Sequence, residues 1–415
     1  RNSSASSDAM PRGVGAKKLY DGLAVMDSKH RALPIMRKHE HTMDVAGDRL
    51  QGLYGLPLCT RSLTFHAEVK LRKDTMQSAQ YHGDRTIRVG VSEPIAPGPG
   101  QVRLDVSFCG ICGTDMHIYH GAMDARVQRP LTLGHEASAT VIDIGPGVTN
   151  VVAGDRVAVR PMLFGEPSPF DKGHPHVGKN LKFIGIDLPG GMQSSWTVAA
   201  STLHKLPDGL SFEHGAMIEP AAVACHDVRM GEVTAGETVV VIGGGPIGLL
   251  VGLVCLHKGA SVILSEVNQT RLALAAQLGM RAVNPLTQNL TTIVERLSDG
   301  AMADCVFEVS GSAAGVEAMT ELPNVRGRIV MVAIHPEPRP VNLFKFFWSE
   351  LRLIGVRLYE EADFEEAIEL AASGVLALDQ LITEVRPIRD VQQTFELIDS
   401  SPDGIKYLID CRGSA

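Results

Sequence analysis

The pattern of hydrophobic and polar positions divides the chain into regions of different character. Between residue 76 and about residue 225, short segments that alternate polar and apolar residues are separated by turns. Segments 101–108 and 137–144 alternate in this way, and a turn at 153–155 leads into a third segment. Because alternation with a period of two is typical of half-buried β-strands, we expect an all-β region here.

A different pattern begins near residue 236, where short apolar runs alternate with segments of helical periodicity. The expected strands are 238–242, 261–266, 304–310 and 328–333, and the expected helices between the first three of them are 247–258 and 270–278. Gly279 then ends the second helix. Alternation of strands and helices is typical of a parallel, doubly wound sheet, so we predict an α/β fold.

One apolar run, residues 239–256, carries no charge and is long enough to be considered as a membrane span. It contains five glycines and a proline, however, and its first half is rich in β-branched residues. A buried strand, a turn and a buried helix explain this composition better. We therefore expect no membrane association, and the polar first residues lack the apolar segment of a signal peptide.

The two ends of the chain differ from the regions between them. Residues 1–75 hold 13 Lys and Arg against 8 Asp and Glu and show no sustained helical or strand period. We expect an extension outside the folded core, disordered or loosely packed, and its basic charge leaves a targeting role open. At the other end, an amphipathic helix at 364–372 and a strand at 406–411 are expected to return to the first region.

Length and composition limit the possible functions. The 415 residues are enough for two domains with separate cores. The formal net charge of −8 argues against nucleic acid or an anionic membrane as a partner. The seven cysteines are scattered, with one close pair, which suits a reducing compartment, so we expect a cytoplasmic protein.

A glycine-rich turn lies between the first strand and the first helix of the second region. Gly243, Gly245 and Gly248 have the spacing of a dinucleotide-binding turn, and Pro246 and Ile247 open the helix. Glycine permits a tight turn and a close approach of the backbone to a pyrophosphate, which then faces the helix N-terminus. The strand before the turn and the helix after it make dinucleotide binding the interpretation we adopt.

An acidic residue at the end of the next strand bears on the choice of coenzyme. Glu266 is placed to accept hydrogen bonds from both ribose hydroxyls, which favours NAD over NADP by charge repulsion. Arg271 lies nearby and could contact the adenosine ribose or a phosphate, so NADP is not fully excluded. We predict NAD as the coenzyme.

Three residues have the side-chain types of a zinc site. Cys112, His135 and Glu136 offer a thiolate, an imidazole and a carboxylate, although each taken singly could be an ordinary structural residue. Asp115 could orient the imidazole of His135 as a hydrogen-bond acceptor. Cys109 and Cys112 could instead form a redox pair. The pair is expected to end a strand rather than to open a helix, which disfavours the redox interpretation.

Several motifs together resemble the zinc-dependent medium-chain dehydrogenase/reductase family, specifically its polyol and L-threonine dehydrogenase branch. The matching stretches are CGICGTDMHIYHG (109–121), LGHEASATVIDIG (133–145), AGDRVAV (153–159), MIEPAAVACH (217–226) and VVVIGGGPIGLL (239–250). They lie in the family's order and spacing over residues 76–415. The resemblance implies a β-rich, GroES-like catalytic domain and a Rossmann coenzyme domain, with the active site in the cleft.

The family's organisation gives the expected domain bounds. These are an extension at 1–75, a GroES-like catalytic domain at 76–228, a Rossmann NAD-binding domain at 229–360 and a return to the catalytic domain at 361–415.

The resemblance also implies roles for individual residues. It makes Cys112 and His135 zinc ligands, and Glu136 a ligand or an exchangeable neighbour with a possible catalytic part. Glu219 matches a carboxylate that some polyol enzymes bring to the metal directly or through water, although it could also be a surface acid beside a helix.

A proton relay is implied by the same resemblance. Thr114 matches the hydroxyl that takes the proton from the bound alcohol, and His117 matches a later position of the relay.

One region departs from the family pattern. Many relatives carry a second, structural zinc on a lobe with four closely spaced cysteines, whereas residues 160–185 contain no cysteine here. His174 and His176 are present but lack partners, so we expect one zinc per chain. That lobe often helps in oligomer contacts, which leaves the oligomeric state open, although a homo-oligomer (dimer or tetramer) is expected.

The leading hypothesis is an NAD-linked zinc dehydrogenase that acts on a small-molecule secondary alcohol. The alternatives are a metal-free NAD(P)H reductase on the same fold and a non-catalytic dinucleotide-binding protein. The ligand set argues against the first alternative, and the relay residue beside it argues against the second. Sorbitol-like polyols, butanediol and L-threonine are all open as substrates.

Overall fold

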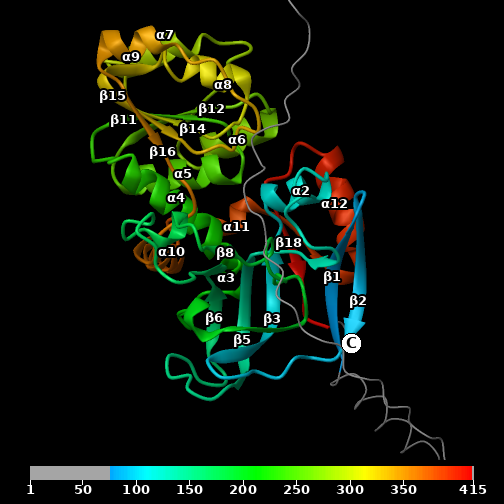
Figure 1. Cartoon of the computed structure of the whole chain (residues 1–415). Coiled ribbons are helices and arrows are strands. Elements are labelled where there is room, and N and C mark those ends of the chain that lie inside the picture. Colours follow the sequence, from blue (N-terminus) through cyan, green and yellow to red (C-terminus); the bar gives the residue numbers. More distant parts are fainter. Residues whose placement is uncertain (1–74, 414–415) are drawn as a thin grey trace, which may run out of the picture. The chain divides into compact units, whose positions relative to one another are not determined.

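The structure, a computed structural model, describes residues 75–413, and Figure 1 shows its helices and strands. The extension expected at residues 1–75 lies outside the described residues except for its last position. Met76 begins the first strand of the described part.

The first region and the C-terminal segment together form a β-rich part. Its strands are β1 (Met76–Gly83), β2 (Thr86–Ser92), β3 (Gln101–Gly110), β4 (Leu131–Thr132), β5 (Glu136–Ile144), β6 (Arg156–Val159), β7 (Met162–Leu163), β8 (Lys182–Phe183), β9 (Ser195–Ala199), β10 (Leu203–Lys205), β17 (Ile382–Pro387) and β18 (Lys406–Asp410). One sheet has the order β10-β6-β5-β3-β18-β17, with β9 also paired to β3, and a second has the order β2-β1-β4. The strands predicted at 101–108 and 137–144 are confirmed as β3 and β5.

Alternation along β3 shows why this segment is a strand. Val102, Leu104 and Val106 are buried, whereas Gln101 and Asp105 are exposed. Side chains of a strand alternate between its two faces, so every second residue enters the core. The same strand pairs antiparallel with β5 and with β18.

The C-terminal strand returns to the first region, as the sequence predicts. Leu408, Ile409 and Asp410 of β18 pair antiparallel with residues of β3, and β17 pairs parallel with β18. Lys406, at the start of β18, contacts the backbone of Ile111, from which it is separated by 295 positions in the chain. The last strand thus lies next to the segment that carries Cys112.

The expectation that the first region is all-β is wrong. It also contains α2 (Gly113–Tyr119), α3 (Phe212–Gly215) and α4 (Ile218–Met230). The first two helices are too short to show a helical period in the sequence. Most of α4 is buried, so it lacks the polar face by which an amphipathic helix is recognised.

The second region is a parallel, doubly wound sheet, which confirms the predicted α/β fold. Its order is β13-β12-β11-β14-β15-β16, the strand order of a Rossmann fold, and every pair is parallel. The strands are β11 (Thr238–Ile242), β12 (Ser261–Ser265), β13 (Arg281–Val283), β14 (Ala303–Glu308), β15 (Pro323–Met331) and β16 (Arg352–Gly355). The helices are α5 (Pro246–His257), α6 (Gln269–Gln277), α7 (Leu290–Leu297), α8 (Ala313–Ala318) and α9 (Leu343–Ser349).

Strand β11 is buried on both faces. Val239 and Val241 pack into the core that includes residues of α4, α5 and α6, whereas Val240 and Ile242 pack with residues of α7 and α8. Helices on both faces explain the continuous apolar run of this strand. Among the described residues, no helix is both long and apolar enough to cross a membrane.

The remaining helices lie in the C-terminal segment. They are α10 (Glu361–Ser373), α11 (Leu378–Leu381) and α12 (Val391–Ser400), and the 3₁₀ turns of the described chain are η1 (Pro175–Val177), η2 (Ala200–Thr202) and η3 (Ile388–Asp390). Helix α10 packs against α4. It extends beyond the predicted 364–372 at its N-terminal end because Glu360 and Asp363 form a capping box there.

Candidate active site

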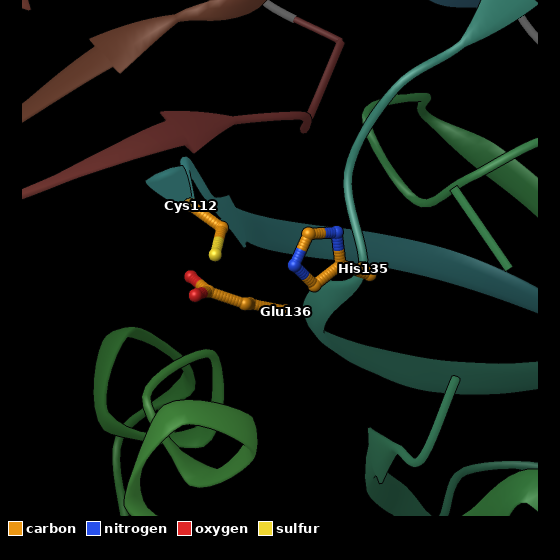
Figure 2. A group of neighbouring side chains, drawn as sticks. All are labelled: Cys112, His135 and Glu136. Atoms are coloured by element: carbon orange, nitrogen blue, oxygen red, sulfur yellow. The ribbon is translucent and has the colours of Figure 1, made fainter. Parts of the chain in front are cut away.

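Cys112, His135 and Glu136 lie together where two paired strands meet a short helix. Each offers one ligand atom, and these atoms all lie within 4.8 Å of one another. Figure 2 shows the three side chains pointing toward a common centre. His135 and Glu136 are buried, and Cys112 is half-buried. The structure thus brings together the three residue types that the sequence suggests for zinc.

The backbone around the cluster requires glycine. Gly110 pairs with Glu136 across β3 and β5, and a Cβ on Gly110 would lie 2.0 Å from a carboxylate oxygen of Glu136. Gly134, directly before His135, has a φ of +92°, and a Cβ there would lie 2.5 Å from the sulfur of Cys109. A larger residue at either position would disturb the side chains around the cluster.

Asp115 organises the backbone around the cluster rather than the imidazole. Its carboxylate accepts hydrogen bonds from the backbone N–H of Cys112 at 2.9 Å and of Gly134 at 3.3 Å. The distance from Asp115 Oδ1 to Nδ1 of His135 is 3.8 Å, too long for a hydrogen bond. The expected direct hydrogen bond between them is therefore absent, because the carboxylate is engaged by the two N–H groups.

A buried lysine that the sequence does not predict contacts the cluster. Lys406 Nζ lies 2.6 Å from Oε1 and 2.5 Å from Oε2 of Glu136, and it donates to the carbonyl of Ile111 at 3.0 Å. Lys406 and Glu136 are both almost fully buried. Their separation of 270 residues explains why no local pattern could reveal the pair.

The second carboxylate implied by the resemblance is held differently from Glu136. Glu219 is in the first turn of α4 and is 5% exposed, so the interpretation as a surface acid is wrong. Its Oε1 accepts a hydrogen bond from the hydroxyl of Tyr359 at 2.8 Å. Glu219 is not in the group of ligand atoms within 4.8 Å found among the described residues. Tyr359 is a second residue for which no sequence pattern provides a signal.

The electrostatics of the cluster favour an added cation. Burial alone would lower the pKa of His135, but the charges of Asp115 and Cys112 outweigh burial and raise it well above its ordinary value. Burial raises the pKa of Glu219 to about 7, although the charge of His135 opposes this shift. Nδ1 of His135 is buried without a hydrogen-bond partner. The donor set and this excess of negative charge fit a divalent metal such as zinc.

The proposed relay residues share one short helix. Thr114 is half-buried in the first turn of α2, beside Cys112, and His117 is exposed in the last turn. Residues three apart on a helix lie on the same side, so Thr114 and His117 share one face of α2.

Of the two cysteines, Cys112 opens a helix, contrary to the expectation, whereas Cys109 ends a strand as expected. Cys112 is the N-cap of α2. Cys109, however, is fully buried at the end of β3, and burial raises the pKa of its thiol well above the ordinary value. A buried thiol with a raised pKa is a poor nucleophile, so the redox interpretation is still disfavoured.

The glycine turn follows β11 and opens α5, as the sequence predicts. Gly243 has a φ of +110°, and a Cβ on Gly248 would lie 1.9 Å from the carbonyl oxygen of Gly243. Gly245 is the N-cap of α5, with Pro246 at its first position. Only glycine allows this close packing of turn on helix, which leaves the helix N-terminus free to face a phosphate.

Two charged residues lie beside this turn. Glu266 accepts a hydrogen bond from the N–H of Gly244 at 2.8 Å and from the N–H of Asn268 at 2.9 Å. Arg271 donates to the carbonyl of Gly404 at 2.9 Å, and its Nη1 lies 4.0 Å from where a Cβ on Gly245 would be. An acidic and a basic side chain are therefore both present beside the turn.

Comparisons with known proteins match both parts of the chain. Residues 98–208 match the family described as alcohol dehydrogenase GroES-like domain, and residues 246–373 match the family described as zinc-binding dehydrogenase. A 2-dehydro-3-deoxy-L-galactonate 5-dehydrogenase from Pseudoalteromonas atlantica is 50% identical over 337 residues, which cover 81% of this chain and 99% of that protein.

The chain belongs to the zinc-dependent medium-chain dehydrogenase/reductase family. Solved structures agree with this assignment. The 2R,3R-butanediol dehydrogenase of Bacillus subtilis is 29% identical and has a TM-score of 0.75, covering 81% of this chain and 99% of that one. A zinc-binding dehydrogenase from Sinorhizobium meliloti 1021, bound to NADP, has the same identity, TM-score and coverage. This medium-chain dehydrogenase is thus an oxidoreductase that acts on CH–OH donors, as the sequence predicts.

Proposed function

We propose that this medium-chain dehydrogenase uses one zinc at Cys112, His135 and Glu136 to oxidise a secondary hydroxyl group with NAD. The observation that carries the proposal is the cluster itself, with its three ligand atoms within 4.8 Å of one another. The glycine turn with Glu266 supports coenzyme binding in the same chain. Together they supply the two partners of hydride transfer from an alcohol.

The chemistry at the cluster divides between the metal and the side chains. A bound zinc supplies Lewis acidity, which lowers the pKa of an alcohol. The Thr114 hydroxyl, on the residue two positions after Cys112, accepts the proton of the alcohol, and His117 passes it to solvent from the exposed end of α2. The hydrogen on the alcohol carbon leaves with its electron pair to the nicotinamide, so the products are a ketone, NADH and a proton.

The buried partners of the cluster preserve its geometry. Lys406 holds Glu136 by both carboxylate oxygens, and Tyr359 holds Glu219 by its hydroxyl. All four side chains lie in the interior, where water competes little for these contacts. We propose that Lys406 keeps Glu136 in place beside the metal while Glu219 remains a less closely bound carboxylate.

We propose NAD rather than NADP as the coenzyme. Glu266 is fixed beside the turn by the backbone N–H groups of Gly244, Val267 and Asn268, and its charge would repel a 2′-phosphate. Arg271 donates a hydrogen bond to the Gly404 carbonyl, so part of its guanidinium group is already used within the protein.

The substrate we propose is a polyhydroxylated carbon chain with a secondary alcohol, with a sugar acid ahead of simple polyols and diols. The relative that is 50% identical bears the name of a deoxy sugar acid dehydrogenase, and it is matched over nearly its whole length. The Bacillus relative, at 29%, bears the name of a diol dehydrogenase.

We also propose that the chain forms a homo-oligomer. Leu343, Phe344, Phe347 and Trp348 of α9 are each more than 60% exposed. Large apolar side chains gathered on one helix face are typical of a contact surface.

An alcohol panel followed at the NADH absorbance tests the proposed function. Deoxy sugar acids, polyols, butanediol and L-threonine should be offered with NAD, using wild-type protein and the Cys112→Ser variant. We expect turnover of at least one secondary alcohol by the wild-type protein and none by the variant. Equal rates in both would assign the activity to a metal-free reductase instead.

A further inference from the structure

A second cluster of metal-ligand side chains lies away from the active site. His174 and His176, on either side of the first residue of η1, meet Glu360 at the start of α10. One ligand atom from each lies within 4.8 Å of the others. Nδ1 of His174 is 2.8 Å from Oε1 of Glu360, and Nδ1 of His176 is 3.9 Å from the same oxygen. The expectation that the two histidines lack partners is therefore wrong, because Glu360 lies 186 positions away from His174 in the sequence and no local pattern indicates it.

His176 has an unsatisfied polar atom at the centre of this cluster. Its side chain is 7% exposed, and its Nδ1 is buried without a hydrogen-bond partner. Buried polar atoms in folded proteins nearly always have a partner, so an orphan nitrogen facing a carboxylate and a second imidazole needs an explanation. A metal ion between the three side chains would satisfy it.

The surroundings orient the carboxylate toward the two histidines. Arg229 Nη2 donates to Oε2 of Glu360 at 2.7 Å, which leaves Oε1 facing the imidazoles. The charge of Arg229 is itself matched by Asp363, which accepts from it at 2.6 and 2.9 Å. His226 bonds the same Asp363 at 2.8 Å and packs edge-on against His176. Such outer contacts hold the ligand side chains of metal sites in a fixed orientation.

We propose that His174, His176 and Glu360 bind a second divalent transition metal of the zinc class, separate from the ion at Cys112. Two imidazoles and one carboxylate are a common zinc ligand set, with one position left for water. Ligand atoms on one tetrahedral zinc lie roughly 3.3 Å apart, between the 2.8 and 3.9 Å seen here. The ion would tie the loop around η1 to α10. The proposal therefore gives two metal ions per chain, where the sequence alone predicts one zinc.

The second site is independent of the proposed function. None of its three ligands belongs to the elements that carry Cys112, His135 and Glu136. A failure of the alcohol panel would leave it untouched, and a failure here would leave the dehydrogenase proposal untouched.

The test is metal stoichiometry in the full-length protein. The protein is stripped with a chelator, loaded with Zn²⁺, freed of weakly held ion by gel filtration and measured by elemental analysis. We expect two zinc ions per chain in the wild type, one in His176→Asn, one in Cys112→Ser and none in the double variant. His214→Asn is the matched control, because His214 pairs with Asp379 at 2.7 Å but belongs to no such cluster in the described part of the chain. It should keep two.

A second variant and a second readout distinguish the loss of a metal ligand from misfolding of the His176 variant. His174 is 59% exposed, so His174→Gln should fold normally and also lose one zinc. In the Cys112→Ser background, bound Co²⁺ should give d–d absorption without a thiolate-to-cobalt charge-transfer band. One zinc in the wild type, or two in both the His174 and His176 variants, would overturn the proposal.

Discussion

Lys406 and Glu136 form a buried ion pair, with Nζ of the lysine 2.6 Å from Oε1 and 2.5 Å from Oε2 of the carboxylate. The pair joins the last strand of the chain, β18, to the start of β5, and the lysine also donates to the carbonyl of Ile111. Glu136 is in turn one of the three proposed ligands. The C-terminal segment therefore contributes a side chain to the candidate active site through this contact.

Replacing the lysine should destabilise the protein strongly. Lys406→Met leaves the buried carboxylate of Glu136 without its counter-charge, and breaking such a pair from one side typically costs about 3–5 kcal/mol. Urea unfolding followed by circular dichroism should show this loss. The control is Lys205→Met, because Lys205 pairs with Asp155 at the surface and is 55% exposed. It should cost less than about 1 kcal/mol, and equal losses in both variants would contradict the role assigned to Lys406.

A pH-dependent contribution is expected from Asp187, which holds the loop beside His135. Its carboxylate accepts from Arg126 at 2.8 and 2.9 Å and from the N–H of Phe183 at 2.8 Å, and the Phe183 ring packs edge-on against His135. Burial would raise the pKa of Asp187, but the hydrogen bonds from Arg126 and Phe183 outweigh it and lower the pKa below its ordinary value.

Because the pKa of Asp187 is lower in the folded state, the stabilisation is present above the unfolded value of about 3.9 and is lost as the pH falls through the folded value. Asp187→Asn should therefore cost about 1 kcal/mol at pH 7, a figure reduced for the partial exposure of Arg126, and progressively less below about pH 4. Urea unfolding at a series of pH values measures this. Asp143→Asn, at a half-exposed pair 3.4 Å long, should change stability little at any pH. A cost for Asp187→Asn that stayed constant down to about pH 2 would contradict this account.

Coenzyme preference should follow Glu266. The wild type should use NAD at least about tenfold better than NADP in kcat/KM, equivalent to about 1.4 kcal/mol. Glu266→Ser should narrow the ratio and raise the KM for NAD, since it also removes the acceptor of the Gly244 N–H. Glu295→Ser, at an exposed position of α7, is the control and should leave both values unchanged. A wild-type preference for NADP would point to Arg271 as the phosphate partner.

Proton transfer should depend on the Thr114 hydroxyl. Thr114→Ala should keep metal and NAD binding but lose kcat by about 10²–10⁴-fold, the usual size of a missing proton-transfer group. Thr114→Ser should recover most of the rate because it keeps the hydroxyl. His117→Ala should be milder and partly rescued at high pH, where solvent accepts the proton. A Thr114→Ala variant that turns over alcohol at the wild-type rate would show that the residue only packs beside the metal.

The sequence predicts those elements whose pattern is local. Strand β11 and helix α5 are confirmed to within a residue, because a continuous apolar run and the glycines at 243–248 determine both elements. Helix α2 is not predicted, because its seven residues span barely two turns and begin with glycine. Helix α4 is long enough to show a helical period, but it is not predicted either. It is buried on nearly all sides, so its sequence lacks the polar face that marks an amphipathic helix.

The candidate site can be predicted only in part. The ligand types at Cys112, His135 and Glu136 are visible in the sequence, and the structure brings them together. Lys406 and Tyr359 could not be predicted, because their carboxylate partners are far away in the sequence. Lys406 is 270 positions from Glu136, and Tyr359 is 140 positions from Glu219. The contact of Lys406 depends on the pairing of β18 with β3, which no local pattern encodes.

Cobalt absorption of the metal-exchanged protein tests the central claim most directly. If Cys112 ligates the active-site metal, Co²⁺ loaded into the stripped wild-type protein should give a thiolate-to-cobalt charge-transfer band. Cys109→Ala should give the same band, because that thiol is buried with a raised pKa at the end of β3. Cys112→Ser should lose the band completely. A band of equal intensity in Cys112→Ser, or no band in the wild type, would contradict the metal centre on which the proposed function depends.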